Sequence, residues 1–289
     1  MNLKSSDEIR IVLIGKTGVG KTAAANTILG ENKFNSELSS SSVTKECDKA
    51  RRNVNQHKVA VIDTPGLFDT KEENTVIDAK IKLCISLSAP GPHVFLVVVQ
   101  LGRFTAEEKN TVEQIQKIFG EQASKYTMVL FTHGDKLKRG QKSIHEFVKD
   151  SPDLLNFIKA TSGRYHVFNN DTHDPNQVEQ LFEKMHKMIS ENRGHFYTNE
   201  MLEKAEITIQ EEKQRILMEN EEQRSKELED LKIKYEAEAL NQAITELWER
   251  KEREAREKAE RNNTFLKIIT EFLFTTLEKF IMRKLGQNQ

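Results

Sequence analysis

Proline and glycine, the two residues that most often interrupt helices, lie in about the first two thirds of this 289-residue chain, with Gly286 as the one exception. All five prolines lie at or before Pro175, and twelve of the thirteen glycines lie at or before Gly194. The 91 residues from His195 to Leu285 contain neither. Because proline removes a helix hydrogen bond and glycine is costly to order, this separation predicts a mixed first part and a helical second part, with the boundary near Gly194.

The second part has the composition of a solvated helix. Residues 200–262 carry 19 acidic and 13 basic side chains, about half of their total. Apolar residues follow a three-to-four spacing only in short stretches, such as Leu228 and Leu231, and none lies between Met218 and Leu228. A coiled coil needs a continuous apolar seam. We therefore expect residues 196–263 to form a charged helical extension, either lone or intermittently paired as a partial coiled coil.

The end of the chain, residues 264–289, differs from this extension. Twelve large apolar side chains fall within residues 264–285, and six charged ones interrupt them. Such a segment is too charged to span a bilayer and too apolar to stay bare in water. Two interpretations stay open for this amphipathic tail. It packs on the first part or on a partner helix, or it lies in the interface of an intracellular membrane.

The first part alternates short apolar runs with helix-like segments. Runs rich in valine and isoleucine predict strands, and the segments between them predict helices that include 105–119 and 175–190. The expected strands are 9–14, 58–63, 94–101, 127–132 and 165–169. Strands that are apolar throughout indicate a parallel sheet covered on both faces. We expect an α/β fold over residues 7–195, with a doubly wound, mostly parallel sheet and helices on both faces.

Composition excludes several classes of protein. The 44 basic and 45 acidic residues leave a net charge of −1, which offers no excess positive field for coating nucleic acid. Cys47 and Cys84 are the only cysteines, too few for a disulfide framework, which fits a reducing compartment. The polar start is followed by no apolar signal segment, and no uncharged run of 18 apolar residues occurs. We expect a cytoplasmic protein without nucleic-acid partners.

The loop after the first expected strand matches the phosphate-binding pattern G-x-x-x-x-G-K-[ST]. Its residues are Gly15, Lys16, Thr17, Gly18, Val19, Gly20, Lys21 and Thr22. The glycines let backbone N–H groups surround phosphate oxygens, and Lys21 adds a point charge. Thr22 offers a hydroxyl to Mg²⁺, and the following helix, with Ala23 as a further nucleotide contact, directs its positive end at the anion. Such ligands lie beyond the carboxyl ends of parallel strands, where this loop is expected.

A second candidate motif ends the strand 58–63. Asp63 closes this apolar run and can anchor Mg²⁺, and Gly66 can donate its N–H to a γ-phosphate. The cluster Asp-Thr-Pro-Gly is also an ordinary turn, but beside a phosphate-binding loop the nucleotide interpretation is favoured. Between the two motifs, the Ser/Thr-rich stretch 36–44 has the length and polarity of a switch segment. Thr44 is its candidate ligand of Mg²⁺.

Base recognition is expected from the loop after the strand 127–132. Asp135 can accept two hydrogen bonds from the N1–H and N2–H₂ groups of guanine, which adenine does not present. His133 stands where guanine-specific loops usually have asparagine and could stack on the base, with Gly134 between the two residues. The alternative is an exposed loop in which Asp135 only caps a helix.

Longer segments resemble one protein family, the GTPases of immunity-associated proteins (GIMAPs), septin-like relatives of Ras. The segments that carry the resemblance are 21–30, 42–47, 63–70, 90–93, 100–108 and 132–135. The resemblance is continuous from about residue 7 to residue 195, and the box QLGRFTAEE at 100–108 is highly specific to that family. It implies a Ras-like fold that binds GTP or GDP with Mg²⁺. It also implies pairing with copies of itself or related members across the nucleotide face, and assembly on intracellular membranes.

The resemblance also assigns individual residues. Ser36 falls where family members touch the nucleotide, and Asn169 or Asn170 falls where they flank the base, although two asparagines after a strand are also an ordinary turn. Arg103 matches an arginine that acts across the dimer as a finger in members that hydrolyse GTP. On composition alone Arg103 would be a surface residue at a strand end. Leu67 and Phe68 follow the motif Asp63 to Gly66, at the place where Ras-type enzymes have a glutamine that orients water. We therefore expect a cation from outside this segment to stabilise the charge of the transition state.

We expect a GTP-dependent switch or scaffold with slow hydrolysis of GTP to GDP and phosphate, stimulated by dimerisation. One alternative is a non-hydrolysing protein that holds GTP for assembly. Another is a membrane tether whose tail is the functional part, peripheral on an intracellular membrane. Hydrolysis that rises with protein concentration separates the first two, and flotation of the tail with liposomes tests the third.

Overall fold

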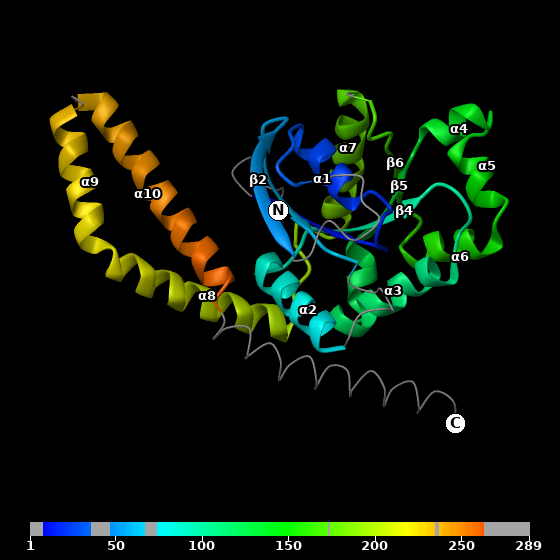
Figure 1. Cartoon of the computed structure of the whole chain (residues 1–289), viewed down its shortest axis with the longest axis horizontal. Coiled ribbons are helices and arrows are strands. Elements are labelled where there is room, and N and C mark those ends of the chain that lie inside the picture. Colours follow the sequence, from blue (N-terminus) through cyan, green and yellow to red (C-terminus); the bar gives the residue numbers. More distant parts are fainter. Residues whose placement is uncertain (1–7, 36–46, 67–73, 173, 235–236, 263–289) are drawn as a thin grey trace.

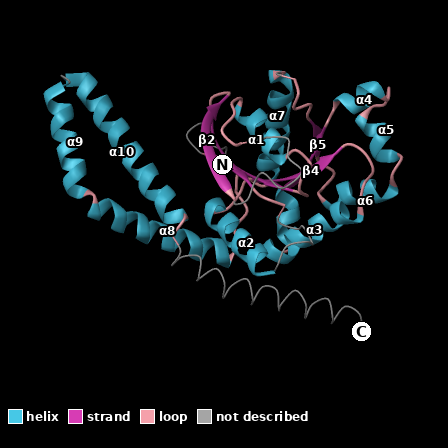
Figure 2. Ribbon diagram, viewed as in Figure 1, coloured by secondary structure: helices cyan, strands magenta, loops and turns pink. Residues whose placement is uncertain are grey.

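The computed structural model describes residues 8–262 apart from 36–46, 67–73, 173 and 235–236. In this part of the chain a six-stranded sheet carries helices on both faces and is followed by a helical arm, defined as residues 200–262 (Figures 1 and 2). Ser36, Thr44 and the tail 264–289 lie outside the described residues.

The sheet has the strand order β2-β3-β1-β4-β5-β6, and among these strands only β2 is antiparallel to its neighbour. The strands are β1 (Ile9–Ile14), β2 (Asp48–Val54), β3 (His57–Asp63), β4 (Val94–Gln100), β5 (Thr127–Thr132) and β6 (Tyr165–Val167). The chain builds outward from β1 in both directions, so the loop after β1 opens where the strand order reverses. That position is the usual ligand site of an open α/β sheet.

Two apolar layers enclose the sheet. The helices are α1 (Lys21–Leu29), α2 (Asn74–Ser88), α3 (Ala106–Phe119), the 3-10 helix η1 (Glu121–Tyr126), α4 (Asp135–Arg139), α5 (Ile144–Lys149), α6 (Pro152–Ala160), α7 (Pro175–Glu191), α8 (Glu200–Glu219), α9 (Glu221–Lys234) and α10 (Ala237–Glu260). Side chains of α2, α3, α6 and α8 share one core with the sheet, and those of α1 and α7 share the other. The doubly wound fold class is therefore confirmed.

The five strands that the apolar runs predict are present. β1 is buried at every position, whereas the short β6 is only partly buried and ends at Val167, before the expected residue 169. The edge strand β2 is not predicted by the sequence pattern. Its sequence DKARRNV has two apolar residues, and most of its positions are half-buried or exposed. It is held to β3 by a two-residue turn in which Asn55 and Gln56 have φ of 47° and 67°. These angles suit a hairpin that follows the twist of the strands.

The arm is three helices rather than one long helix. α8 ends at Glu219 and is capped by Asn220, whose side-chain amide donates to the carbonyl of Ile216 at 2.7 Å. α9 and α10 then form a hairpin, and α10 returns along α8 towards the sheet (Figure 1). Leu247 and Ala255 of α10 and Ile209 of α8 are buried. A charged helix in water gains most of its stability from such packing, which explains why the extension folds back.

Ion pairs hold the end of α10 against β2 of the sheet and against α8. The Nζ of Lys49 in β2 lies 2.8 Å from the Oε1 of Glu260, and both side chains are at most 2% exposed. Arg256 binds Glu206 at 2.6 Å and Glu260 at 2.9 Å. Burial lowers the pKa of Lys49 to about 8, an effect that the Glu260 carboxylate opposes. A buried pair of this kind adds little net stability, because the desolvation of the two charges offsets their attraction. No helix in the described part is both long enough and apolar enough to cross a membrane.

We expect the free energy of unfolding to fall as the pH drops below about 6.5, the pKa of an unfolded histidine. Burial lowers the pKa of His93 to about 3 and that of His166 to about 4. His93 is neutral because its Nδ1 accepts the N–H of Arg10 at 3.1 Å. Below pH 6.5 the unfolded chain therefore binds protons that the folded chain does not, so acid favours unfolding. Each histidine should cost about 2 kcal/mol at pH 5.

Urea unfolding at pH 7 and pH 5 measures this difference. His93→Gln keeps an acceptor for the Arg10 N–H but does not titrate, so its stability should depend less on pH than that of the parent. An equal loss in both proteins would contradict the role of His93.

Candidate nucleotide-binding site

The phosphate-binding loop joins β1 to α1, as the sequence predicts. Gly15 has φ of 155°, and a Cβ there would lie 2.5 Å from the carbonyl oxygen of Val98, so only glycine fits. α1 begins at Lys21, and no side chain caps its first N–H groups. Uncapped N–H groups at the start of a helix are donors for an anion. The loop therefore has the backbone geometry that a phosphate group requires.

Lys21 is buried beneath this loop, at 6% exposure. Its Nζ donates to the carbonyl oxygens of Gly15 at 2.9 Å and Lys16 at 2.8 Å. The ammonium is thus held among the loop's own backbone groups, where it adds a positive charge beside the helix terminus.

Thr22 and Asp63 form the candidate Mg²⁺ position. The Thr22 hydroxyl in the first turn of α1 donates to the Oδ2 of Asp63 at the end of β3 at 2.7 Å. Asp63 ends β3, is 1% exposed, and is paired in register with Leu13 of β1. A hydroxyl and a carboxylate are hard oxygen ligands of the kind Mg²⁺ prefers, with phosphate and water oxygens completing its shell. The residues present fit this metal.

The loop 63–66 touches the phosphate-binding loop directly. A Cβ on Gly66 would lie 2.1 Å from the Oγ1 of Thr17, so a larger residue would force the loops apart. The hydroxyl of Thr64 donates to the carbonyl oxygen of Leu13 at 2.6 Å, which anchors the start of this loop to β1. Gly66 therefore lies against Thr17 of the phosphate-binding loop, and the donation of its N–H to a phosphate stays a prediction.

The loop after β5 presents the predicted base-recognition residues. His133 has φ of 59°, and its Nδ1 lies 3.2 Å from the Oγ1 of Thr132. The N–H of Gly134 donates to Phe168 O at 2.9 Å. Asp135 is the first residue of α4, and Gly134 occupies the capping position, so Asp135 is not the helix cap of the alternative interpretation.

Among the described residues, only one of the two oxygens of the Asp135 carboxylate has a hydrogen-bond partner. Its Oδ2 binds the Nη2 of Arg139 at 2.9 Å. Its Oδ1 is buried and has no hydrogen-bond partner among the described residues. A buried acceptor without a donor is costly, and a guanine edge would supply the missing donors. The site therefore fits guanine on an observation independent of the motif.

Asn169 and Asn170 reach the same site from the end of β6. The Oδ1 of Asn170 accepts the hydroxyl of Thr27 in α1 at 3.1 Å. The N–H of Asn169 donates to the Oε1 of Gln177 in α7 at 2.9 Å. The first bond places Asn170 beside the helix that follows the phosphate-binding loop, and the second ties Asn169 to α7. The contact of either asparagine with a base stays a prediction.

Arg103 lies in the connection between β4 and α3. It is exposed, and no carboxylate within the described ranges pairs with it. The structure brings its loop to the same carboxyl edge of the sheet as the other loops, because Leu101 N–H donates to Thr132 O at 3.2 Å. Its role as a finger stays a prediction.

A model of the AIG1 family matches residues 9–220, most of the chain. The chain belongs to the AIG1 family. It is 34% identical over 196 residues to GTPase IMAP family member 8 of Homo sapiens, which covers 66% of this chain and 29% of that protein. It is 33% identical over 224 residues to Immune-associated nucleotide-binding protein 7 of Arabidopsis thaliana, over 75% of this chain and 71% of that protein. The family expected from the motifs is confirmed.

The AIG1-family chain spans less than a third of the human relative. Immune-associated nucleotide-binding protein 9 of Arabidopsis thaliana is matched over 65% of its length. Among solved structures, Toc33 from Arabidopsis thaliana in complex with GDP and Mg²⁺ superposes with a TM-score of 0.51 and 21% identity, over 66% of this chain and 88% of that one. At this identity the likeness shows the shared fold.

Sequence reasoning missed the threonines that bind the loops of this AIG1-family site together. The Thr132 hydroxyl is buried at the end of β5 and donates to the carbonyl oxygen of Val19 at 2.7 Å. Thr27 and Thr64 make the contacts to Asn170 and Leu13 described above. Each threonine lies next to or within a predicted motif, but the motif patterns fix only the residues that face a ligand.

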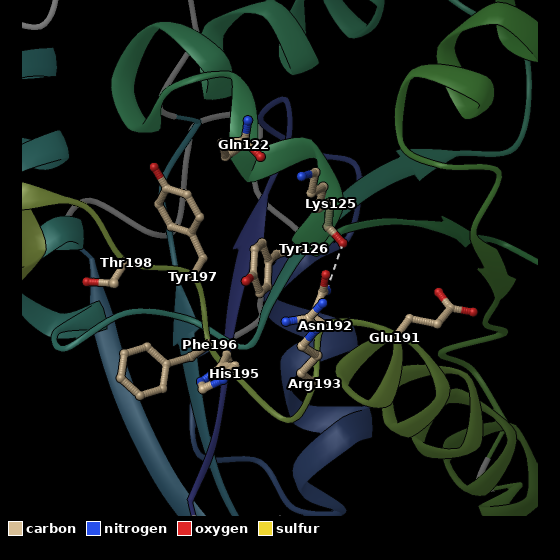
Figure 3. A pocket seen from close by; sticks show the side chains of 10 residues that line it. All are labelled: Gln122, Lys125, Tyr126, Glu191, Asn192, Arg193, His195, Phe196, Tyr197 and Thr198. Carbon is tan, nitrogen blue, oxygen red and sulfur yellow. Dashed lines mark hydrogen bonds between the residues drawn. The ribbon is translucent and has the colours of Figure 1, made fainter. Parts of the chain in front are cut away.

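A separate hollow of about 620 Å³ lies at the amino ends of the strands (Figure 3). It is bounded by η1, the end of α7 and residues 195–198, with Tyr126 and Phe196 among its aromatic walls and Lys125 and Arg193 among its cations. None of the predicted nucleotide residues lines it. The candidate site is therefore the set of loops at the opposite edge.

Proposed function

We propose that this chain is a Mg²⁺-dependent GTPase, a switch or scaffold whose slow hydrolysis is stimulated when two copies meet across the nucleotide face. The observation that carries the proposal is the contact of three loops at one sheet edge, marked by the Thr22–Asp63 bond and the partnerless Oδ1 of Asp135. The naming of the human relative as a GTPase supports it.

Each loop has a task in this proposal. The N–H groups at the start of α1 and the Lys21 ammonium bind phosphate oxygens, which orients the nucleotide. Thr22 and Asp63 hold Mg²⁺, which neutralises phosphate charge when bound. Asp135 selects guanine by accepting its N–H groups. Arg103 of a second copy approaches the terminal phosphate and stabilises charge that develops as the bond to it breaks.

The main alternative is an assembly protein that binds GTP without hydrolysing it. The apolar residues after Gly66 favour it, because they cannot orient water. Single-turnover hydrolysis measured over a dilution series separates the two. A rate constant that rises with protein concentration supports the dimer-stimulated enzyme, and tight GTP binding without phosphate release supports the scaffold.

We take residues 7–195 as the nucleotide-binding unit, 196–263 as the helical extension and 264–289 as a tail. The tail would bring a cytoplasmic protein to the surface of an intracellular membrane, as a lipid-interface segment does. Flotation of the full chain and of a chain ending at Asn262 with anionic liposomes tests this. If both chains float with the liposomes to the same extent, the tail does not bind the membrane.

Asp135→Asn is expected to lower GTP affinity by about a hundredfold and to raise affinity for xanthosine triphosphate. The amide replaces an acceptor by a donor, which opposes the guanine N–H groups but suits the O2 of xanthine. Displacement of a fluorescent nucleotide measures both affinities. Asp153→Asn, which alters an exposed carboxylate of α6, is the control and should bind GTP as the parent does. Unchanged GTP affinity in Asp135→Asn would disprove the base assignment.

A further inference from the structure

We propose, on the basis of the GTPase function above, that Lys136 is a positioning residue for Arg103. Its side chain crosses from the base-recognition loop to the loop that carries Arg103 and holds that loop in one place. The direction in which Arg103 leaves the surface then depends on Lys136, although Lys136 does not touch the nucleotide in this role.

The first observation is a hydrogen bond between the two loops. The Nζ of Lys136 donates to the carbonyl oxygen of Leu101 at 2.9 Å, two residues before Arg103. The N–H of Leu101 donates to Thr132 O at 3.2 Å. Both backbone polar groups of Leu101 are thus bound, one by α4 and the other by β5, and the Leu101 side chain is 1% exposed.

The second observation concerns the other side of Arg103. The ring of Phe104 packs edge-on against Phe157 of α6, with centroids 5.1 Å apart. Thr105 caps α3, since its N–H donates to the Oε2 of Glu108 at 2.8 Å and its hydroxyl accepts the Glu108 N–H at 3.3 Å. Residues 104 and 105 are therefore anchored to two different helices.

Between these anchors lie Gly102 and Arg103, and both are exposed. Arg103 consequently projects from a span of two residues that is held at each end. A finger that must reach a phosphate on another molecule gains from such preorganisation, because a displacement of about 1 Å can cost a hundredfold in rate. Gly102 has no side chain with which to brace the span, so the anchor at Leu101 carries much of the restraint.

Lys136 also follows Asp135 directly, and its N–H donates to the carbonyl oxygen of His133 at 3.0 Å. The first turn of α4 thus carries both the carboxylate that faces the base and the ammonium that holds the Arg103 loop. A guanine bound at Asp135 would steady this turn and, through Lys136, the loop that presents Arg103 to the partner. Base recognition and the finger are connected by one side chain.

Lys136→Met is the test, with Lys138→Met as the matched control on the exposed face of the same helix. We expect Lys136→Met to bind GTP within about twofold of the parent and to lose about tenfold in turnover at concentrations that pair the parent. Lys136→Arg retains a donor and should recover most of this loss, and Lys138→Met should behave as the parent. Turnover equal to the parent in Lys136→Met would overturn the proposal.

A double variant separates positioning from a direct effect. If Lys136 acts through Arg103, Lys136→Met should cause no further loss in an Arg103→Ala background. A further tenfold loss there would show that Lys136 acts by itself and would overturn the proposal.

Amide hydrogen exchange tests the anchor even if the parent proves not to hydrolyse GTP. Peptides covering residues 100–105 should exchange faster in Lys136→Met than in Lys138→Met. If exchange is faster in Lys136→Met and the parent protein does not hydrolyse GTP, the GTPase function is refuted but the anchoring role of Lys136 is supported. Equal exchange would refute the anchor whatever the hydrolysis rate.

Discussion

Lys21→Ala is expected to lower GTP affinity by about a hundredfold or more and to leave the fold intact. The Lys21 ammonium is buried among the carbonyl oxygens of Gly15 and Lys16, next to the uncapped start of α1. A charge-assisted bond to phosphate at such a position contributes about 3 kcal/mol, which corresponds to that loss. The bonds from Lys21 to Gly15 and Lys16 lie within one loop and do not join strands of the sheet.

Titration with a fluorescent GTP analogue measures the affinity, and circular dichroism with urea unfolding monitors the fold. Lys125→Ala, an exposed lysine at the opposite end of the sheet, controls for the loss of one positive charge. Normal GTP affinity in a folded Lys21→Ala protein would contradict the assignment of the loop.

The parts of the fold that the sequence predicts are those whose cause is local. β1 and β5 are apolar at nearly every position because both faces are covered, and that burial is visible in the residue types. The phosphate-binding loop is predictable for a similar reason, since its glycines and lysine each meet a requirement of the loop itself. Asp63 could be named because it ends such a strand.

The parts that escape prediction depend on contacts between distant residues. β2 is charged along most of its length because it forms an edge of the sheet, so its sequence resembles that of a loop. The return of α10 depends on Glu260 meeting Lys49, two residues 211 positions apart. The amino-acid composition does not distinguish a charged residue in a buried ion pair from a charged residue on a solvent-exposed helix face. For this reason the sequence predicts residues 196–263 only as a charged helical extension, lone or intermittently paired, and not the return of α10 along α8.

The residues of the candidate site likewise divide into those that the sequence predicts and those that only contacts between distant residues reveal. The motifs predict which residues face a ligand, but not which residues hold those loops against one another. The bond from Thr132 to Val19 spans 113 positions and that from Lys136 to Leu101 spans 35. Neither bond has a sequence signature, because a threonine or a lysine beside a motif is ordinary. Only the geometry identifies them.

The largest effect on turnover is expected for Arg103→Ala, which should keep GTP affinity and lose about a thousandfold of the dimer-stimulated rate. Arg103 is exposed and has no carboxylate partner in the described part of its own chain, so its guanidinium is available to a second copy. Leu67 and Phe68, which directly follow Gly66, carry no charge that could meet the developing charge. An arginine finger is worth a thousandfold or more where no other group meets that charge.

Single-turnover phosphate release, measured at concentrations that pair the parent, checks this expectation. Arg103→Lys keeps the positive charge but loses the planar fork that binds two oxygens, so it should recover little of the rate. A full rate in Arg103→Ala at those concentrations would exclude the finger.

Mixing tests whether Arg103 acts on the other copy. Arg103→Ala retains an intact phosphate-binding loop, whereas Lys21→Ala retains Arg103 but binds nucleotide poorly. If Arg103 acts across the dimer, adding Lys21→Ala protein to GTP-loaded Arg103→Ala protein should restore part of the lost rate. A finger acting within its own chain would give no recovery even when light scattering shows that the mixed pair forms. The size of the pair and the rate of phosphate release, measured on the same sample, therefore decide from which copy the guanidinium comes.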